Sequence, residues 1–204
     1  MTLKNISKRW RVVLVVTGIA IIYAAYIAIR PYDVVAVSIG GSYEKARLGN
    51  TLSPSEPGHY WGGFVTRPSV LRFVDSQYGF ITPAAKFLSV SYDENGSVAT
   101  VRISPQVKIL SLDKALTIVF DLQDQFRKGG WLPFNVDTDP PFEKTEKMRS
   151  AIGQCSDPSS YWQAGDKYQI LLNIRCFWID EKPNEARYLI TFSISDLVYE
   201  NNDF

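Results

Sequence analysis

An apolar stretch near the N-terminus constrains this chain more than any other feature. The 18 residues between Arg11 and Arg30, VVLVVTGIAIIYAAYIAI, carry no charge. At a helical rise of about 1.5 Å per residue they extend roughly 27 Å, close to the hydrocarbon core of a bilayer at about 30 Å. A buried helix of a soluble protein usually keeps a polar stripe at helical spacing, and this stretch has none. The sequence therefore predicts a transmembrane helix over residues 11–30.

The charges beside this stretch predict its orientation. Lys4, Lys8, Arg9 and Arg11 lie at or before its start, and residues 1–30 contain no acidic residue. The positive-inside rule then gives a cytoplasmic tail of residues 1–10 and an exported domain of residues 31–204. A cleaved signal peptide is the alternative, but Ile22-Tyr23-Ala24 is a poor cleavage site. We expect a single-pass protein of the inner (cytoplasmic) membrane, with the bilayer around residues 11–30 and a periplasmic C-terminal domain.

The charge balance of the expected domain argues against nucleic acid as a partner. Five of the 22 basic residues and none of the 21 acidic residues lie in residues 1–30. Residues 31–204 therefore hold 17 basic and 21 acidic residues, a net charge of −4. Nucleic-acid binding needs a basic face, so we expect no nucleic-acid partner.

The two cysteines, Cys155 and Cys176, both lie in the expected domain. In an oxidising compartment such a pair predicts a disulfide. The alternative is that Cys176 is a buried thiol. Two cysteines and one histidine are too few for a zinc site with conventional ligands. Phosphate-loop and dinucleotide fingerprints are also missing, so the sequence predicts neither a metal nor a cofactor.

Residues 86–104, KFLSVSYDENGSVATVRIS, predict a β-hairpin around Asn95-Gly96, a strong two-residue turn signal. Pairing outward from this turn makes every second pair apolar. The apolar pairs are Tyr92/Ala99, Val90/Val101 and Leu88/Ile103, and the pairs between them are polar. One buried and one wet face are typical of an antiparallel sheet covered on one side.

Residues 111–130, SLDKALTIVFDLQDQFRKGG, predict the helix that covers this sheet. Ser111 is placed to cap it, Gly129 to end it, and apolar residues recur at helical spacing. Residues 167–179 and 186–195 alternate as in a second hairpin. The expected fold class is α+β: the transmembrane helix, then a mostly antiparallel sheet of about five strands with one long helix on one face.

No constellation in the sequence predicts catalysis, so we do not expect an enzyme. A serine or cysteine triad would have to use the only histidine, His59, which lies in a Gly/Pro-rich loop without a nucleophile elbow. Asp137, Asp139 and Glu143 belong to the densest acidic run. That run has the composition of a turn followed by a helix start, and it also offers a docking patch for a basic partner.

Aromatic residues in predicted loops are the other candidates for partner contact. His59-Tyr60-Trp61 and Tyr161-Trp162 lie in such loops, and tyrosine and tryptophan are enriched at binding hot spots. The alternative is that these rings pack under the loops as part of the core. The candidate partner-binding residues are His59, Tyr60, Trp61, Asp137, Asp139, Glu143, Tyr161 and Trp162.

The stretch AIRPYDVVAVSIGGSYEKARL resembles the juxtamembrane region of a group of small single-pass bacterial inner-membrane proteins with a periplasmic domain. Arg30, Pro31 and residues 34–37 carry the resemblance. Some members of that group resemble immunity proteins that neutralise type VI or contact-dependent effectors. The resemblance implies a membrane-anchored protein-binding domain and, more narrowly, an immunity protein with a toxin as its partner. The alternative is an accessory or assembly subunit of an envelope or secretion complex.

Overall fold

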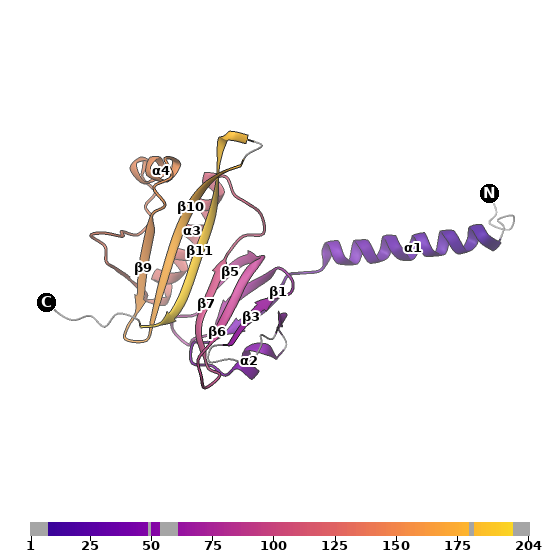
Figure 1. The fold of residues 1–204 in the computed structure, drawn as a ribbon, viewed down its shortest axis with the longest axis horizontal. Coiled ribbons are helices and arrows are strands. Elements are labelled where there is room, and N and C mark those ends of the chain that lie inside the picture. The colour runs from indigo at the N-terminus through magenta and orange to yellow at the C-terminus, as the bar shows by residue number, and fades with distance from the viewer. Residues whose placement is uncertain (1–7, 49, 54–60, 180–181, 198–204) are drawn as a thin grey trace. The chain divides into compact units, whose positions relative to one another are not determined.

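The structure, a computed structural model, describes residues 8–48, 50–53, 61–179 and 182–197 (Figure 1). Within these residues the chain forms four helices and 11 strands in two sheets, and it is an α+β protein. The chain divides into two compact units, Met1–Tyr32 and Asp33–Phe204. The second unit is called the domain below.

Helix α1 (Lys8–Ile29) belongs to the first unit. None of the helices in the described part of the chain is long and apolar enough to cross a membrane. The predicted transmembrane helix over residues 11–30 is therefore wrong, and so is the inner-membrane location with a cytoplasmic tail and a periplasmic domain. Lys8, Arg9 and Arg11 lie inside the helix, so its uncharged part is shorter than the helix itself.

The larger sheet of the domain has eight described strands, all antiparallel to their neighbours. In spatial order they are β2 (Leu52–Ser53), β3 (Trp61–Val65), β6 (Phe87–Tyr92), β7 (Val98–Ser104), β11 (Lys182–Asp196), β10 (Tyr168–Ile179), β9 (Ser159–Ala164) and β8 (Leu132–Phe134). The prediction of one sheet of about five strands is wrong. Residues 61–65 and 159–164 were expected in loops because glycine and serine there mask the alternation of the strands.

The smaller sheet has the order β1-β4-β5. Strand β1 (Asp33–Val37) runs parallel to β4 (Ser69–Phe73), and β5 (Phe80–Ala85) is antiparallel to β4. Phe73 and Phe80 lie with ring centroids 5.3 Å apart, and Phe80 also contacts Phe192 of the larger sheet at 5.5 Å. The smaller sheet therefore covers part of one face of the larger one.

That covered face, here called the core face, also carries the three helices of the domain that are described. Helix α2 (Tyr43–Arg47) contacts Tyr92 through Tyr43, at 4.8 Å between ring centroids. Helix α3 (Leu112–Gly129) contacts Trp162 and Phe192 through Phe126, at 5.6 and 6.1 Å. Helix α4 (Glu146–Gly153) is joined to α3 by the Arg149–Asp113 salt bridge of 2.6 Å. The opposite face of the larger sheet is called the open face below.

The hairpin of β6 and β7 has the predicted register over four pairs, from Leu88/Ile103 to Ser91/Thr100. Next to the turn a bulge pairs Tyr92 with Val98 instead of Ala99. Helix α3 also forms where predicted, but it ends one residue later, with Gly130 in the left-handed conformation at φ 85°. Its predicted apolar stripe packs inward, and Ala115, Leu116, Val119, Leu122 and Phe126 are buried.

Candidate functional site

The open face of the larger sheet is lined by hydroxyl, aromatic and basic side chains. One row of facing residues crosses seven strands in register: Phe64, Ser89, Arg102, Ser193, Leu171, Tyr161 and Phe134. Residues on one face of a strand alternate with those on the other, so this row lies on the face opposite the core. Ser89 is the one buried member of the row, and the other six are half-buried or exposed. The only charged side chain in the row, Arg102, lies near its centre.

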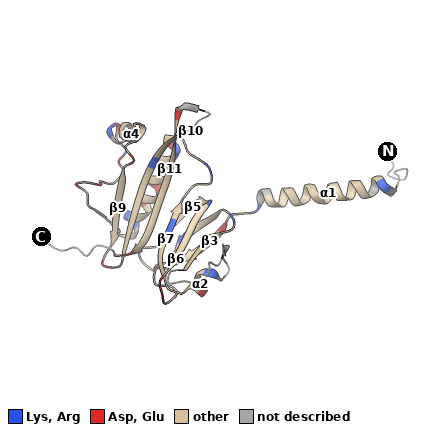
Figure 2. Ribbon diagram, in the orientation of Figure 1, with Lys and Arg blue, Asp and Glu red and all other residues tan. Residues whose placement is uncertain are grey.

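A pocket of about 360 Å³ opens at this position on strands β7, β10 and β11. Its lining includes Arg102, Ser104, Leu171, Arg175, Thr191 and Ser193. We call it the basic pocket. Arg102 is the only charged residue of β7 and Arg175 the only one of β10. Figure 2 colours the lysine and arginine positions of the described chain blue along the ribbon. Both side chains are exposed, and neither pairs with a described acidic residue.

A second pocket, of about 460 Å³, adjoins the basic pocket and is mostly apolar. Its lining includes Lys86, Phe87, Val107, Lys108, Ile109 and Leu189. We call it the apolar pocket. The two pockets share Phe87, Ser104 and Thr191, and together they form what we call the open-face groove. Phe87 is 48% exposed and Ile109 50% exposed, so large apolar groups are accessible in this groove.

The open-face groove is basic although the rest of the domain is not. Arg102, Arg175, Lys86 and Lys108 line it, and no aspartate or glutamate does. Residues 31–204 carry a net charge of −4, so positive charge concentrated here marks an electrostatically distinct surface. Clefts lined by one sign of charge attract ligands of the opposite sign.

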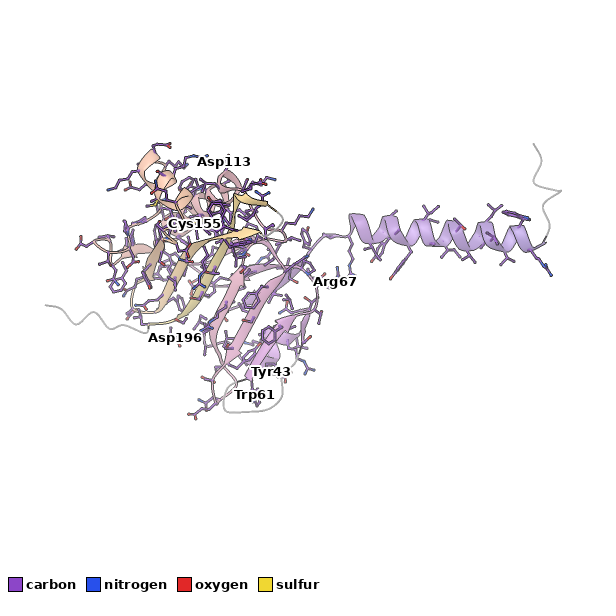
Figure 3. All side chains as sticks on the ribbon, turned by 45° about the horizontal axis from the view of Figure 1, so that its top comes forward. Tyr43, Trp61, Arg67, Asp113, Cys155 and Asp196 are labelled. Atoms are coloured by element: carbon purple, nitrogen blue, oxygen red, sulfur yellow. A yellow bond between two sulfur atoms is a disulfide. The ribbon has the colours of Figure 1, made fainter. Side chains whose placement is uncertain are left out.

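The predicted aromatic residues separate into different environments. His59 and Tyr60 lie outside the described residues. Trp61 opens β3 on the core face, half-buried against Tyr43 at 5.6 Å (Figure 3). Its ring contacts that of Tyr43, which limits the part that a partner can reach.

Tyr161 and Trp162 are adjacent residues of β9 and therefore point to opposite faces. Trp162 is fully buried: its Nε1 donates a hydrogen bond to Ser160 Oγ over 3.2 Å, and Arg127 stacks on its ring at 5.3 Å. Trp162 is thus a core residue that no partner can reach in this conformation. Tyr161 is half-buried on the open face, in the same row as Arg102.

The acidic run lies in the segment after β8, at the edge of the larger sheet. Asp137 and Glu143 are exposed and Asp139 is half-buried. Asn135 accepts hydrogen bonds from the N–H groups of Thr138 and Asp139, at 3.2 and 2.8 Å, so this stretch is a tight turn. The groove on β6, β7, β11 and β10 does not include the acidic run.

The predicted disulfide is present: Cys155, just after α4, is bonded to Cys176 on β10. Asp157 strengthens the same connection, because its Oδ1 accepts a hydrogen bond of 2.7 Å from the N–H of Cys176. Among the described residues no cluster of histidine, cysteine, aspartate or glutamate is arranged to hold a metal ion.

Comparisons with protein-family models, curated proteins and solved structures found no match to this chain.

Sequence reasoning missed the groove residues for identifiable reasons. The alternation predicts Arg102 on the polar face of the first hairpin, which is correct. That Arg102 lines the same pocket as Arg175 depends on β7 and β10 both flanking β11. Alternation along residues 167–179 predicts that Trp178 shares the core face with Ile174 and Cys176, but Trp178 is 56% exposed near the end of β10. Both strands of this hairpin extend past the ends of their neighbours, so alternation no longer implies burial there.

Proposed function

We propose that this protein is a protein-binding domain and that the open-face groove is its principal contact surface. One observation carries the proposal. Four cationic side chains line the groove without an acidic residue, beside exposed Phe87 and Ile109, in a domain of net negative charge. Accessible apolar side chains surrounded by charge of one sign are typical of interfaces.

The narrower form of the proposal is an inhibitor that neutralises a secreted effector, as an immunity protein does. A rigid sheet supports this role, because an inhibitor binds tightly when its contact surface is already ordered before binding. Strands β6, β7, β10 and β11 form the floor of the groove and are hydrogen-bonded to one another. Tyr161 lies on the same face and extends the contact surface toward β9.

The alternative is an accessory or assembly subunit of a larger complex. Helix α1 favours it, because its apolar side chains are exposed all round, as Val12 at 58%, Ile19 at 62% and Ile22 at 71% illustrate. Apolar surface of this extent is stabilised when another protein covers it. In this role α1 contributes to assembly in addition to the groove.

The acidic run is a second candidate contact. Asp137 and Glu143 are exposed and suit a basic partner surface. We rank this run below the groove because it lies on a turn and lines neither the basic pocket nor the apolar pocket.

A matched set of variants tests the proposal. The groove variant is Arg102→Glu/Arg175→Glu, and the control is Lys114→Glu/Lys147→Glu, which changes the net charge equally on α3 and α4. Each full-length protein is used to capture partners from the native source, and the captured protein is then purified and titrated. The proposal predicts stoichiometric binding to the native chain and to the control, and its loss with the groove variant.

The next measurement separates the two roles. A partner that is toxic alone, and is neutralised by the native chain but not by the groove variant, establishes the inhibitor. A non-toxic complex that requires residues 8–29 establishes the assembly role. Equal binding by the groove and control variants overturns the proposal.

A further inference from the structure

The two halves of the open-face groove require different chemistry in whatever occupies it. The basic pocket presents two guanidinium groups, from Arg102 and Arg175, and the hydroxyls of Ser104, Thr191 and Ser193. The apolar pocket presents Phe87, Val107, Ile109 and Leu189. Because the pockets share walls, one ligand fills both only if it carries anionic and apolar groups side by side.

The anionic groups that fit the basic pocket are carboxylates. Arginine binds carboxylates through two parallel hydrogen bonds, and exposed guanidinium groups without an acidic partner are free to do so. Neighbouring hydroxyls can donate to the same carboxylates or to a main-chain carbonyl. Lys86 and Lys108 add two further cations at the apolar pocket, so the groove suits several carboxylates rather than one.

The extent of the groove favours an extended peptide. Lys86 directly precedes β6 and Arg175 lies on β10, and these strands are separated by β7 and β11. Three strand spacings of about 4.8 Å give roughly 14 Å. An extended chain covers that distance with about four to five residues. A fatty acid brings only one carboxylate, which leaves most of these cations unpaired.

Nucleic acid fits the groove less well. Binding to single strands combines phosphate contacts with aromatic side chains on which the bases stack. Phe87 is the only accessible ring on the shared wall of the groove. The aliphatic lining of the apolar pocket instead suits a leucine, isoleucine or methionine side chain.

We infer that the open-face groove binds an extended acidic segment of a partner protein, with carboxylates on Arg102 and Arg175 and one aliphatic side chain in the apolar pocket. This inference rests on the proposed protein-binding function and specifies the partner's chemistry.

Fluorescence polarisation with labelled peptides and the full-length chain tests the inference. The probe contains Glu-Glu-Leu-Glu-Glu between glycines, and companion probes replace the glutamates with glutamine or the leucine with serine. We expect the glutamine probe to bind at least about tenfold more weakly and the serine probe at least about threefold more weakly. Arg102→Glu/Arg175→Glu should lower affinity for the first probe as much as the glutamine replacement does, and Lys114→Glu/Lys147→Glu should not.

Ile109→Ser tests the apolar pocket with little risk to folding, because Ile109 is half-exposed. It should weaken the leucine probe about threefold and leave the serine probe unchanged. Thermal unfolding followed by circular dichroism verifies that each variant is folded.

Three results overturn the inference. They are equal affinity for the glutamate and glutamine probes, tighter binding of a deoxythymidine oligonucleotide of matched charge, and glutamate-probe binding that the Arg102/Arg175 exchange leaves intact. The proposed function has a separate outcome. If the captured native partner depends on Arg102 and Arg175 while no acidic probe binds, the inference fails and the proposed function stands.

Discussion

The side-chain amide of Gln123 forms two hydrogen bonds with the main chain of Phe142. Its Nε2 donates to the Phe142 carbonyl oxygen over 2.8 Å, and its Oε1 accepts from the Phe142 N–H over 2.8 Å. Gln123 is fully buried on α3, within the apolar stripe of that helix. Gln123 thus gives Phe142 the two main-chain hydrogen bonds that a neighbouring strand would otherwise provide. These bonds hold the segment between β8 and α4 against the core.

Gln123→Ala should lower the free energy of unfolding by about 2–4 kcal/mol, because both main-chain groups of Phe142 lose their buried partner. Urea unfolding measures the loss. Gln125 is the matched control: it makes the same pair of bonds to the main chain of Ile81, at 3.0 Å each, but at the exposed surface. Gln125→Ala should lower the free energy of unfolding by less than about 1 kcal/mol, because water replaces the amide. If Gln123→Ala and Gln125→Ala lower it equally, burial does not decide the strength of these bonds.

The disulfide predicts a second stability change. Cys155 and Cys176 are 21 residues apart, and in the chain-entropy model closing such a loop stabilises the fold by about 3 kcal/mol. Cys155→Ala/Cys176→Ala should lose this amount, and dithiothreitol should destabilise the native chain equally. Dithiothreitol should not affect the double variant further. A loss below about 1 kcal/mol in both experiments would mean that the bond does not constrain the unfolded chain.

Two buried or half-buried tyrosines should respond oppositely to removal of the hydroxyl. The Tyr92 hydroxyl is buried and has no hydrogen-bond partner among the described residues, and burial with the nearby Tyr43 raises the pKa of Tyr92 to about 12. Tyr92→Phe should therefore stabilise the domain by up to about 1 kcal/mol. Tyr168 donates to Asp75 Oδ2 over 3.2 Å, so Tyr168→Phe should cost about 0.5–1.5 kcal/mol. Calorimetry measures the melting temperature of each variant. If Tyr92→Phe destabilises the domain, the Tyr92 hydroxyl makes a hydrogen bond after all and the prediction fails.

The pH dependence of stability should include a term from Asp75. Burial raises the pKa of Asp75, but four opposing effects together bring the net pKa below the usual 3.8. They are the hydrogen bonds from the N–H groups of Tyr78 and Gln77, the hydrogen bond from the Tyr168 hydroxyl, and the charge of Lys167. The ionised carboxylate therefore stabilises the fold above pH 3.8, and this contribution disappears as the pH falls through the lower folded-state pKa. Asp75→Asn should destabilise the domain at pH 7 and much less at pH 2.

Asp196 provides the opposite control for that experiment. Burial, together with Asp93, raises the pKa of Asp196, so its ionised form disfavours folding above that pKa. Asp196→Asn should stabilise the domain at pH 7 and leave it unchanged at pH 2. Urea unfolding at pH 7 and pH 2 measures the free energy of unfolding of both variants. If both variants change it in the same direction at pH 7, the opposite pKa shifts assigned to Asp75 and Asp196 are wrong.

The elements that the sequence predicts well are those in which local signals agree. Asn95-Gly96 fixes the β6–β7 turn and alternation fixes its faces, so four pairs of the register follow without tertiary information. The periodicity of α3 is equally local, and its apolar stripe is buried as expected.

The remaining features depend on contacts between distant segments. Ser160 and Trp162 are buried on β9 because β9 pairs with β10, which no local pattern in SSYWQA reveals. The buried Gln123 is unpredictable for the same reason, since its partner Phe142 is 19 residues away in irregular structure. The open-face groove exists only because β11 inserts between β7 and β10, which brings Arg102 and Arg175 together.

The most direct measurement is the dissociation constant of the complex between the full-length chain and its captured partner. It should be determined for the native protein, Arg102→Glu/Arg175→Glu and Lys114→Glu/Lys147→Glu at equal ionic strength. If the groove is the contact surface, the groove variant should bind at least about thirtyfold more weakly, roughly 2 kcal/mol, and the control should stay within about threefold. Equal affinities for the two variants would contradict the account.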